Sequence, residues 1–221
     1  MTAGRTWVAG LLVLAAAGCA GSGSAGPSGN AAASSPAAVA TPSASSSPSP
    51  TPSSTPAATP DPGRLPQTTA SPSATDPAFT ARMRDFWSAV IRDRPAAALP
   101  PFLPLGAYQQ VKALADPAAD WRGRLVSQYD LDLGVAHRLV GPGATLQGVD
   151  VPAQAARWVQ PGEEYNKLGY WRVYGTRLRY RTAAGRTGSF GIFSLISWRG
   201  QWYVVHLGPI SRPAGTGAIV P

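Results

Sequence analysis

Two adjacent glutamates and a nearby tyrosine are the residues of this chain that could perform acid–base chemistry. Glu163 and Glu164 are its only glutamates, and they follow a Pro-Gly pair that is typical of a loop. Adjacent side chains of an extended chain point to opposite sides, so the two carboxylates are not expected to form one paired site. A single glutamate beside Tyr170 would supply a proton acceptor next to a hydroxyl donor. A solvated loop, or an ion pair with Lys167 or Arg172, is the simpler interpretation and is favoured.

A histidine near the end of the chain is the second candidate. His206 stands in an apolar run, and its expected neighbours are apolar as well, so the imidazole should be buried. A buried histidine can act as an acid, a base or a ligand contact near neutral pH, although a hydrogen-bonded core histidine is favoured. The residues placed around this candidate pocket are His206, Phe193, Trp202, Tyr170, Trp171, Glu163 and Glu164.

Other catalytic and cofactor motifs are missing. Ser189 lies in Gly-Ser-Phe-Gly, which lacks the Gly-x-Ser-x-Gly spacing of a nucleophile elbow, and no phosphate-binding glycine loop is present. The two histidines, His137 and His206, are far apart and have no cysteine near them. The sequence therefore predicts neither a metal site nor a cofactor.

The elements that must position these residues fall into helices first and strands last. Apolar residues at three-and-four spacing predict helices over 76–94 and 106–115 and a third from about 116. The pattern leaves open whether the third helix continues through residues 130–140. Alternation then predicts strands over 145–151, 155–160, 169–182, 188–198 and 201–208. The expected fold class is α+β, with the helices packed on one face of a bent antiparallel sheet.

The last two strands should form a hairpin that turns at Arg199-Gly200. Both faces of this hairpin are apolar, so both must be covered, and a pocket, the C-terminal tail or a partner subunit could cover the second. The predicted cross-strand pairs are Trp198–Gln201, Ile196–Tyr203, Ser194–Val205 and Ile192–Leu207 on one face, and Ser197–Trp202, Leu195–Val204 and Phe193–His206 on the other.

The N-terminus has the organisation of an export signal. Arg5 precedes a short apolar run of small residues that ends in Ala-Ala-Gly before Cys19, the only cysteine. This sequence resembles the lipobox of bacterial lipoproteins. The resemblance implies that residues 1–18 are removed, that Cys19 carries lipid and that the protein is held on the extracytoplasmic face of the cell membrane. An ordinary secretory signal with an incidental cysteine is the alternative.

A linker should separate this anchor from the folded domain. Residues 19–75 consist almost entirely of Ala, Ser, Pro, Thr and Gly, with two charges and no aromatic residue. Such a composition cannot bury enough apolar surface to fold, so this segment is predicted to be disordered and residues 76–221 to form one domain.

The chain is basic, with a formal net charge of +8. Arg177, Arg179 and Arg181 alternate along one predicted strand and should share a face. This stripe could contact anionic lipid or an anionic envelope polymer, although a solvated strand face is favoured. A basic, aromatic composition is also typical of nucleic-acid binding. An exported, tethered domain would seldom meet nucleic acid, so no nucleic-acid partner is expected.

Two segments carry a family resemblance. Residues 158–175 (WVQPGEEYNKLGYWRVYG) and 194–209 (SLISWRGQWYVVHLGP) resemble an uncharacterised group of actinobacterial lipoproteins, and the order of elements is similar to the NTF2-like (cystatin-like cone) superfamily. The resemblance implies a pocket between helices and sheet but brings no catalytic residues. The favoured hypothesis is non-enzymatic binding of a small apolar ligand or an envelope component. An isomerase- or lyase-type enzyme with a His/Tyr/Glu pocket, and a homodimerising or protein-docking module, are the alternatives.

Overall fold

The computed structural model describes residues 61–221 of the chain. The predicted signal peptide, Cys19 and most of the predicted linker lie outside the described residues. Within residues 61–221, none of the helices combines the length and the apolar character that a membrane span requires.

The first long helix, α1 (Pro77–Arg92), forms where the apolar spacing predicts it. The Asp76 carboxylate accepts hydrogen bonds from two backbone N–H groups of the first turn, and Pro77 stands at the first helical position. Asp93 ends the helix in the left-handed conformation, with φ of 49°. The buried stripe of α1 contains Phe79, Met83, Phe86, Trp87, Ala89 and Val90.

The second helix is shorter than the sequence predicts. Helix α2 (Leu105–Val111) ends at Lys112, whose backbone is extended, instead of continuing to residue 115. The cause is pairing with a distant loop, because Lys112 forms an antiparallel bridge with Asn166 and the backbone N–H of Ala113 donates to Tyr165. Tertiary hydrogen bonding therefore replaces the last helical turn and draws the loop 160–169 against α2.

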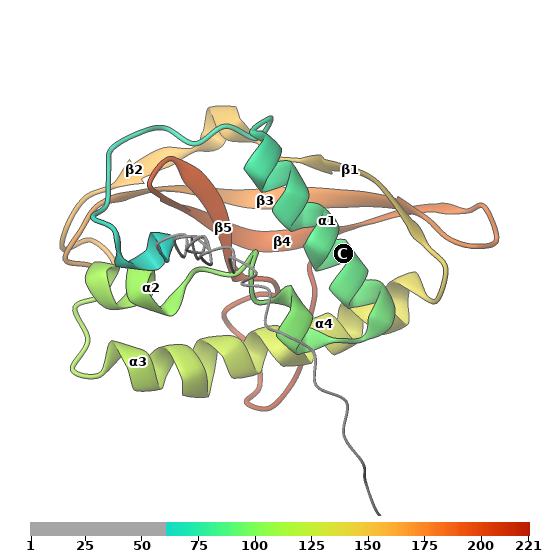
Figure 1. Cartoon of the computed structure of the whole chain (residues 1–221). Helices are drawn as coiled ribbons and strands as arrows, with labels where there is room; N and C mark the ends of the chain where they lie inside the picture. The colour runs from blue at the N-terminus through green and yellow to red at the C-terminus, as the bar shows by residue number, and fades with distance from the viewer. Residues whose placement is uncertain (1–60) are drawn as a thin grey trace, which may run out of the picture. The chain divides into compact units, whose positions relative to one another are not determined.

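The third helical segment continues through the region that the sequence leaves open. Helix α3 (Pro117–Asp120), the π-helical turn η3 (Trp121–Val126) and helix α4 (Ser127–Val140) follow one another without a break, as Figure 1 shows. Gly134 lies inside α4, so a single glycine does not end this helix. Short 3-10 turns, η1 (Pro62–Arg64), η2 (Pro95–Ala98) and η4 (Ala153–Ala155), connect the other elements.

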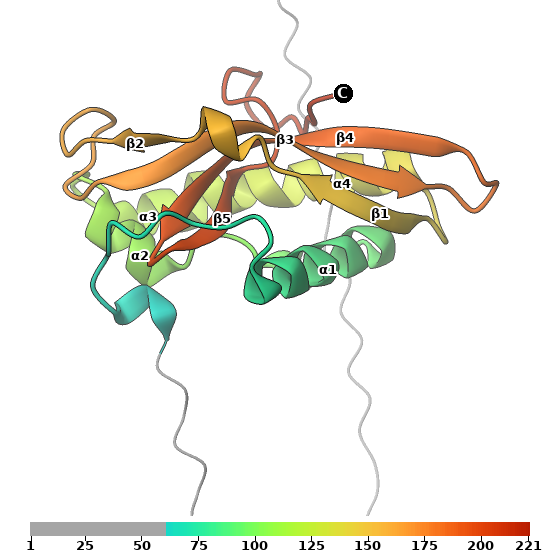
Figure 2. The same cartoon turned by 90° about the horizontal axis from the view of Figure 1, so that it is seen from above.

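Five antiparallel strands form one sheet, which confirms the predicted α+β class. They are β1 (Thr145–Asp150), β2 (Arg157–Val159), β3 (Tyr170–Arg181), β4 (Thr187–Trp198) and β5 (Gln201–His206). The order is β1-β3-β4-β5, and β2 pairs with the start of β3. Helices α1 and α2 and the continuous α3–η3–α4 segment lie on the same side of this sheet in Figure 2. On that side Trp87 of α1 packs against Tyr180 and Phe190.

The β4–β5 hairpin keeps the predicted turn and the predicted register near that turn, but not beyond it. Arg199 and Gly200 both have positive φ, as a two-residue primed turn requires. The four predicted pairs nearest the turn are present, and then the register shifts so that Ser194 faces His206. The predicted pairs Ser194–Val205, Ile192–Leu207 and Phe193–His206 are therefore wrong.

The reason for the shift is the pairing on the outer side of β5. The backbone N–H of Val204 donates to Pro101, and the Val204 carbonyl accepts from Leu103. Val205 is the extra residue of a β-bulge, which moves the side chain that follows it to the opposite face. His206 consequently shares a face with Ser194 instead of Phe193.

Residues 61–75, which the sequence places in the linker, pack against this hairpin. The side chain of Gln67 donates to the carbonyls of Gly169 and Ser197 and accepts from the backbone N–H of Arg199. The indole N–H of Trp198 donates to Pro62 at 2.7 Å. The compact domain thus begins before residue 76. The end of the hairpin is bound by a segment whose composition alone gave no sign of folding.

Candidate functional site

A cavity of about 320 Å³ opens between the helical layer and the sheet. Its wall on the sheet side comes from alternate residues of β3, namely Tyr170, Arg172 and Tyr174. Residues two apart on a strand share a face, so the period of the strand places all three in the same cavity. Ser194 and Ile196 of β4 face them across the sheet, because Ser194 pairs with Tyr174 and Ile196 with Arg172.

The bulge in β5 brings His206 into this cavity. Its imidazole Nδ1 lies 3.0 Å from the Ser194 hydroxyl oxygen. Burial is the main cause that lowers the pKa of His206 to about 4, and the positive charges of Arg124, Lys112 and Arg212 act in the same direction. His206 is therefore a neutral imidazole at neutral pH.

Glu164 is the carboxylate of the cavity, and protein groups occupy both of its oxygens. The Tyr170 hydroxyl donates to Oε2 at 2.6 Å, and Oε1 forms an ion pair with the Arg172 guanidinium. Burial raises the pKa of Tyr170 well above its usual range, so the phenol stays protonated. The loop holds this geometry because the Asn166 side chain accepts from the Glu164 backbone N–H and donates to two carbonyls, and because Tyr165 adopts positive φ.

A second carboxylate is neutralised on the helical side. Asp120 and Arg124 stand one helical turn apart and form a bidentate pair at 2.6 and 2.7 Å, which lowers the pKa of Asp120. The hydroxyl of Tyr108, from α2, donates to the same carboxylate at 2.5 Å. Burial raises the pKa of Tyr108, so it also remains a donor.

Lys112 completes the polar lining at the end of α2. Its ammonium group donates to the backbone carbonyl of Glu164 at 2.8 Å. Burial is the main cause that lowers the pKa of Lys112, and repulsion from Arg124 adds to it. The apolar part of the lining consists of Leu125, Ile196, Val205 and Ile210.

The structure brings three of the seven predicted pocket residues together, namely Tyr170, Glu164 and His206. Phe193 does not line the cavity but contacts two residues that do, since its ring lies 6.5 Å from that of His206 and 5.3 Å from that of Tyr174. The other three predicted residues do not line the cavity.

These three residues have other partners. Trp202 is buried in the core. Trp171 packs edge-on against Trp158 and donates to the backbone carbonyl of Thr69. Glu163 is exposed and forms an ion pair with Arg157 at 2.8 Å, not with Lys167 or Arg172. Arg157 lies within ion-pair distance of both glutamates, but only Glu164 lines the cavity.

Sequence reasoning named Arg172 as a possible ion-pair partner of a glutamate, which the Glu164–Arg172 pair confirms, but it missed Lys112, Arg124 and Tyr108. The spacing of Asp120 and Arg124 on one helix could have identified that pair, since residues four apart are neighbours. Lys112 gave a weaker signal, as one of only two lysines, directly after the buried stripe of α2.

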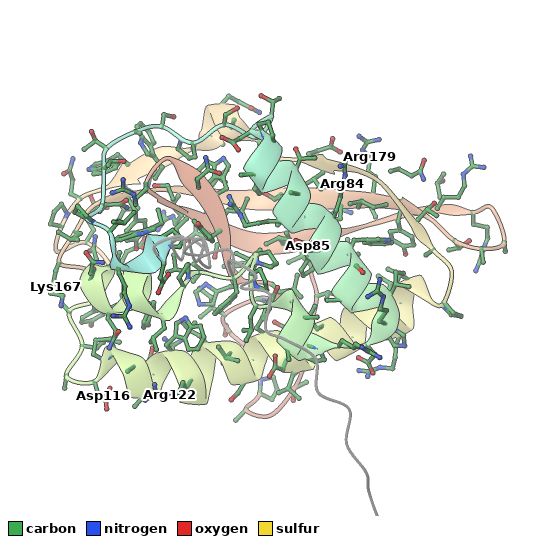
Figure 3. The ribbon with its side chains drawn as sticks, viewed as in Figure 1. Arg84, Asp85, Asp116, Arg122, Lys167 and Arg179 are labelled. Atoms are coloured by element: carbon green, nitrogen blue, oxygen red, sulfur yellow. The ribbon has the colours of Figure 1, made fainter. Side chains whose placement is uncertain are left out.

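The arginine stripe of β3 is largely bound to protein groups. Arg179 forms an ion pair with Asp150 at 2.6 Å, and Arg177 donates to Ser189 and to the backbone carbonyl of Pro221. Arg179 lies near β1 in Figure 3 and does not line the cavity. Within residues 61–221, no cluster of three or more His, Cys, Asp or Glu side chains could hold a metal ion.

No family model, curated protein sequence or solved structure matches this chain. The likeness to lipoproteins and to the NTF2-like superfamily therefore stays a prediction. The function has to be argued from the cavity.

Proposed function

We propose that this protein is a lipoprotein, anchored on the extracytoplasmic face of the cell membrane through Cys19, whose domain binds a small molecule without transforming it. The proposed ligand site is the cavity between α2, η3 and strands β3–β5. Its size suits a small organic molecule, and its lining of apolar groups with a few placed polar groups is typical of binding sites. The NTF2-like resemblance agrees with a pocket at this place.

One observation favours binding over catalysis, namely that protein groups already occupy the carboxylate of the cavity, Glu164, and the carboxylate beside it, Asp120. Glu164 accepts from Tyr170 and pairs with Arg172, and Asp120 is held by Arg124. Within the described residues, neither carboxylate forms a hydrogen bond or ion pair with His206. A general acid and base must reach the same substrate atoms, and a base that is already ion-paired and hydrogen-bonded is a weak proton acceptor.

The isomerase- or lyase-type alternative would need Tyr170 as a donor to a developing oxyanion. The Tyr170 hydroxyl has one proton, and it donates that proton to Glu164. Catalysis would require this contact to break first. Binding needs no such rearrangement, because the tyrosine and the carboxylate can fix the shape of the site as they stand.

The experiment is native mass spectrometry of the full chain, purified from its host membrane in a non-ionic detergent. We expect a small-molecule adduct, together with the acyl mass that lipidation of Cys19 adds. The variant Ile210→Trp should lose the adduct, because Ile210 stands half-exposed at the cavity and a larger side chain there would obstruct it.

The matched control is Leu139→Trp. Leu139 is exposed to a similar degree on α4 and does not line the cavity, so the adduct should survive this change. Repeated purification without any adduct would refute ligand binding. A mature chain without acyl mass would refute the anchor.

A further inference from the structure

Three cationic side chains line the cavity, namely Lys112, Arg124 and Arg172, and carboxylates in or beside the cavity neutralise two of them. Asp120 compensates Arg124, and Glu164 compensates Arg172. Lys112 forms no ion pair with any residue of the 61–221 region and has only a backbone carbonyl as its partner. A partly buried ammonium group without a counter-ion is unfavourable, because burial removes water that a neighbouring charge would have to replace.

A buried donor of Arg172 is also without a partner. Its Nε lies buried and has no acceptor among residues 61–221, although the same guanidinium pairs with Glu164 through Nη1. Buried donors are nearly always hydrogen-bonded in proteins, and among the described residues Arg172 is the one with such an unpaired atom that lines this cavity, which favours an acceptor supplied by a ligand. The guanidinium also lies over the Tyr174 ring, 4.4 Å from its centre, which fixes it against the sheet.

Neighbouring titratable groups respond to the same positive field. After burial, the nearby cations are the next causes that lower the pKa of His206 and of Lys112. A negative charge in the cavity would reduce the electrostatic repulsion at both residues. The cavity also has accessible apolar surface, because Tyr174 and Ile210 line it and are about half exposed.

We propose that the ligand of this cavity carries a single carboxylate or phosphate group, held by Lys112 and Arg172, on an apolar body that lies against Ile196, Val205 and Ile210. This inference rests on the proposed function. One uncompensated cation calls for one anionic group, and the apolar side of the lining calls for a hydrophobic remainder. Such a molecule could be a free organic acid or an anionic lipid, and the probes below distinguish these sources.

The experiment is isothermal titration calorimetry on the full chain in non-ionic detergent. The probes are 4-phenylbutanoate, the neutral 4-phenylbutanol and the short-chain lipid dihexanoyl phosphatidate. We expect at least one anion to bind, and the alcohol to bind at least tenfold more weakly than 4-phenylbutanoate. The tighter anion of the two identifies the source.

The charge-removing variant is Lys112→Met, and it should weaken anion binding by about 10- to 100-fold, the usual effect of losing a charge-assisted hydrogen bond. Lys112→Arg keeps the charge and should retain most of the affinity. The control is Lys167→Met, because Lys167 is the other lysine, is exposed at the edge of the molecule in Figure 3 and does not line the cavity.

Equal binding of the acid and the alcohol, or equal affinities of Lys112→Met and Lys167→Met for the anion, would overturn the inference and leave small-molecule binding intact. Failure of all three probes would overturn it too. Binding in general is then judged separately, by the adduct seen or not seen in native mass spectrometry.

Discussion

His206 should make the stability of the domain depend on pH between about 4 and 6.5. An unfolded chain takes up a proton on histidine near pH 6.5, whereas burial and nearby cations hold the pKa of His206 at about 4 in the folded protein. Between these values the unfolded state binds more protons than the folded state. The contribution of His206 to the free energy of unfolding is therefore fully present above about pH 6.5 and is lost as the pH drops toward 4.

The size of the effect follows from the two pKa values. The full difference corresponds to about 3 kcal/mol, and about 2 kcal/mol of it is lost between pH 7 and pH 5. Urea unfolding of the full chain, followed by the fluorescence of the buried Trp198 and Trp202, measures it at both pH values. His206→Gln removes the titrating group and keeps a polar partner for Ser194.

The comparison of the two proteins isolates this histidine, because the carboxylates titrate in both. We expect the loss of stability between pH 7 and pH 5 to be about 2 kcal/mol smaller in His206→Gln than in the natural chain. Equal losses in the two proteins would refute the assignment of His206 to a buried, neutral state.

The remaining predictions concern the two ends of the domain. Asp132 is buried on α4, pairs with Arg212 and accepts hydrogen bonds from two backbone N–H groups of the C-terminal tail. Asp132→Ala should therefore lower the free energy of unfolding, measured by urea titration, by about 3–5 kcal/mol. A loss below about 1 kcal/mol would contradict this prediction. Gln67→Ala removes two hydrogen bonds to the hairpin end and one to Gly169, so it should lower the free energy of unfolding by about 1–3 kcal/mol and speed proteolytic cleavage within residues 61–75. Unchanged cleavage would show that this segment adds nothing to the fold.

Local signals in the sequence predicted the helix starts and most strand bounds. Asp76 followed by proline caps α1 as expected, and the period-two pattern placed β3 within a residue of its bounds at each end. These features depend on residues that are close together in the chain, so the local sequence pattern is enough to predict them. The end of α2 does not, since Lys112 leaves the helix to pair with Asn166 far along the chain.

The linker boundary failed for a related reason. Residues 61–75 have the composition of a disordered segment, and composition measures only what a segment can bury within itself. Gln67 and Pro62 instead satisfy donors and acceptors of the hairpin, including the indole N–H of Trp198. A polar segment can be held by a partner that is already folded, and no local pattern reports that.

The candidate site depends on a single inserted residue. Without the bulge at Val205, alternation would place the imidazole on the same face as Val204, as the sequence predicts, and it would point away from Tyr170 and Arg172. With the bulge, three strands and two helical segments deliver their polar groups to one cavity. The charged residues of that cavity come from separate parts of the sequence and do not belong to one motif. Among the described residues, Lys112 has no carboxylate partner because Asp120 pairs with Arg124 and Glu164 pairs with Arg172. The proposed preference of the cavity for an anion is therefore a property of the assembled fold.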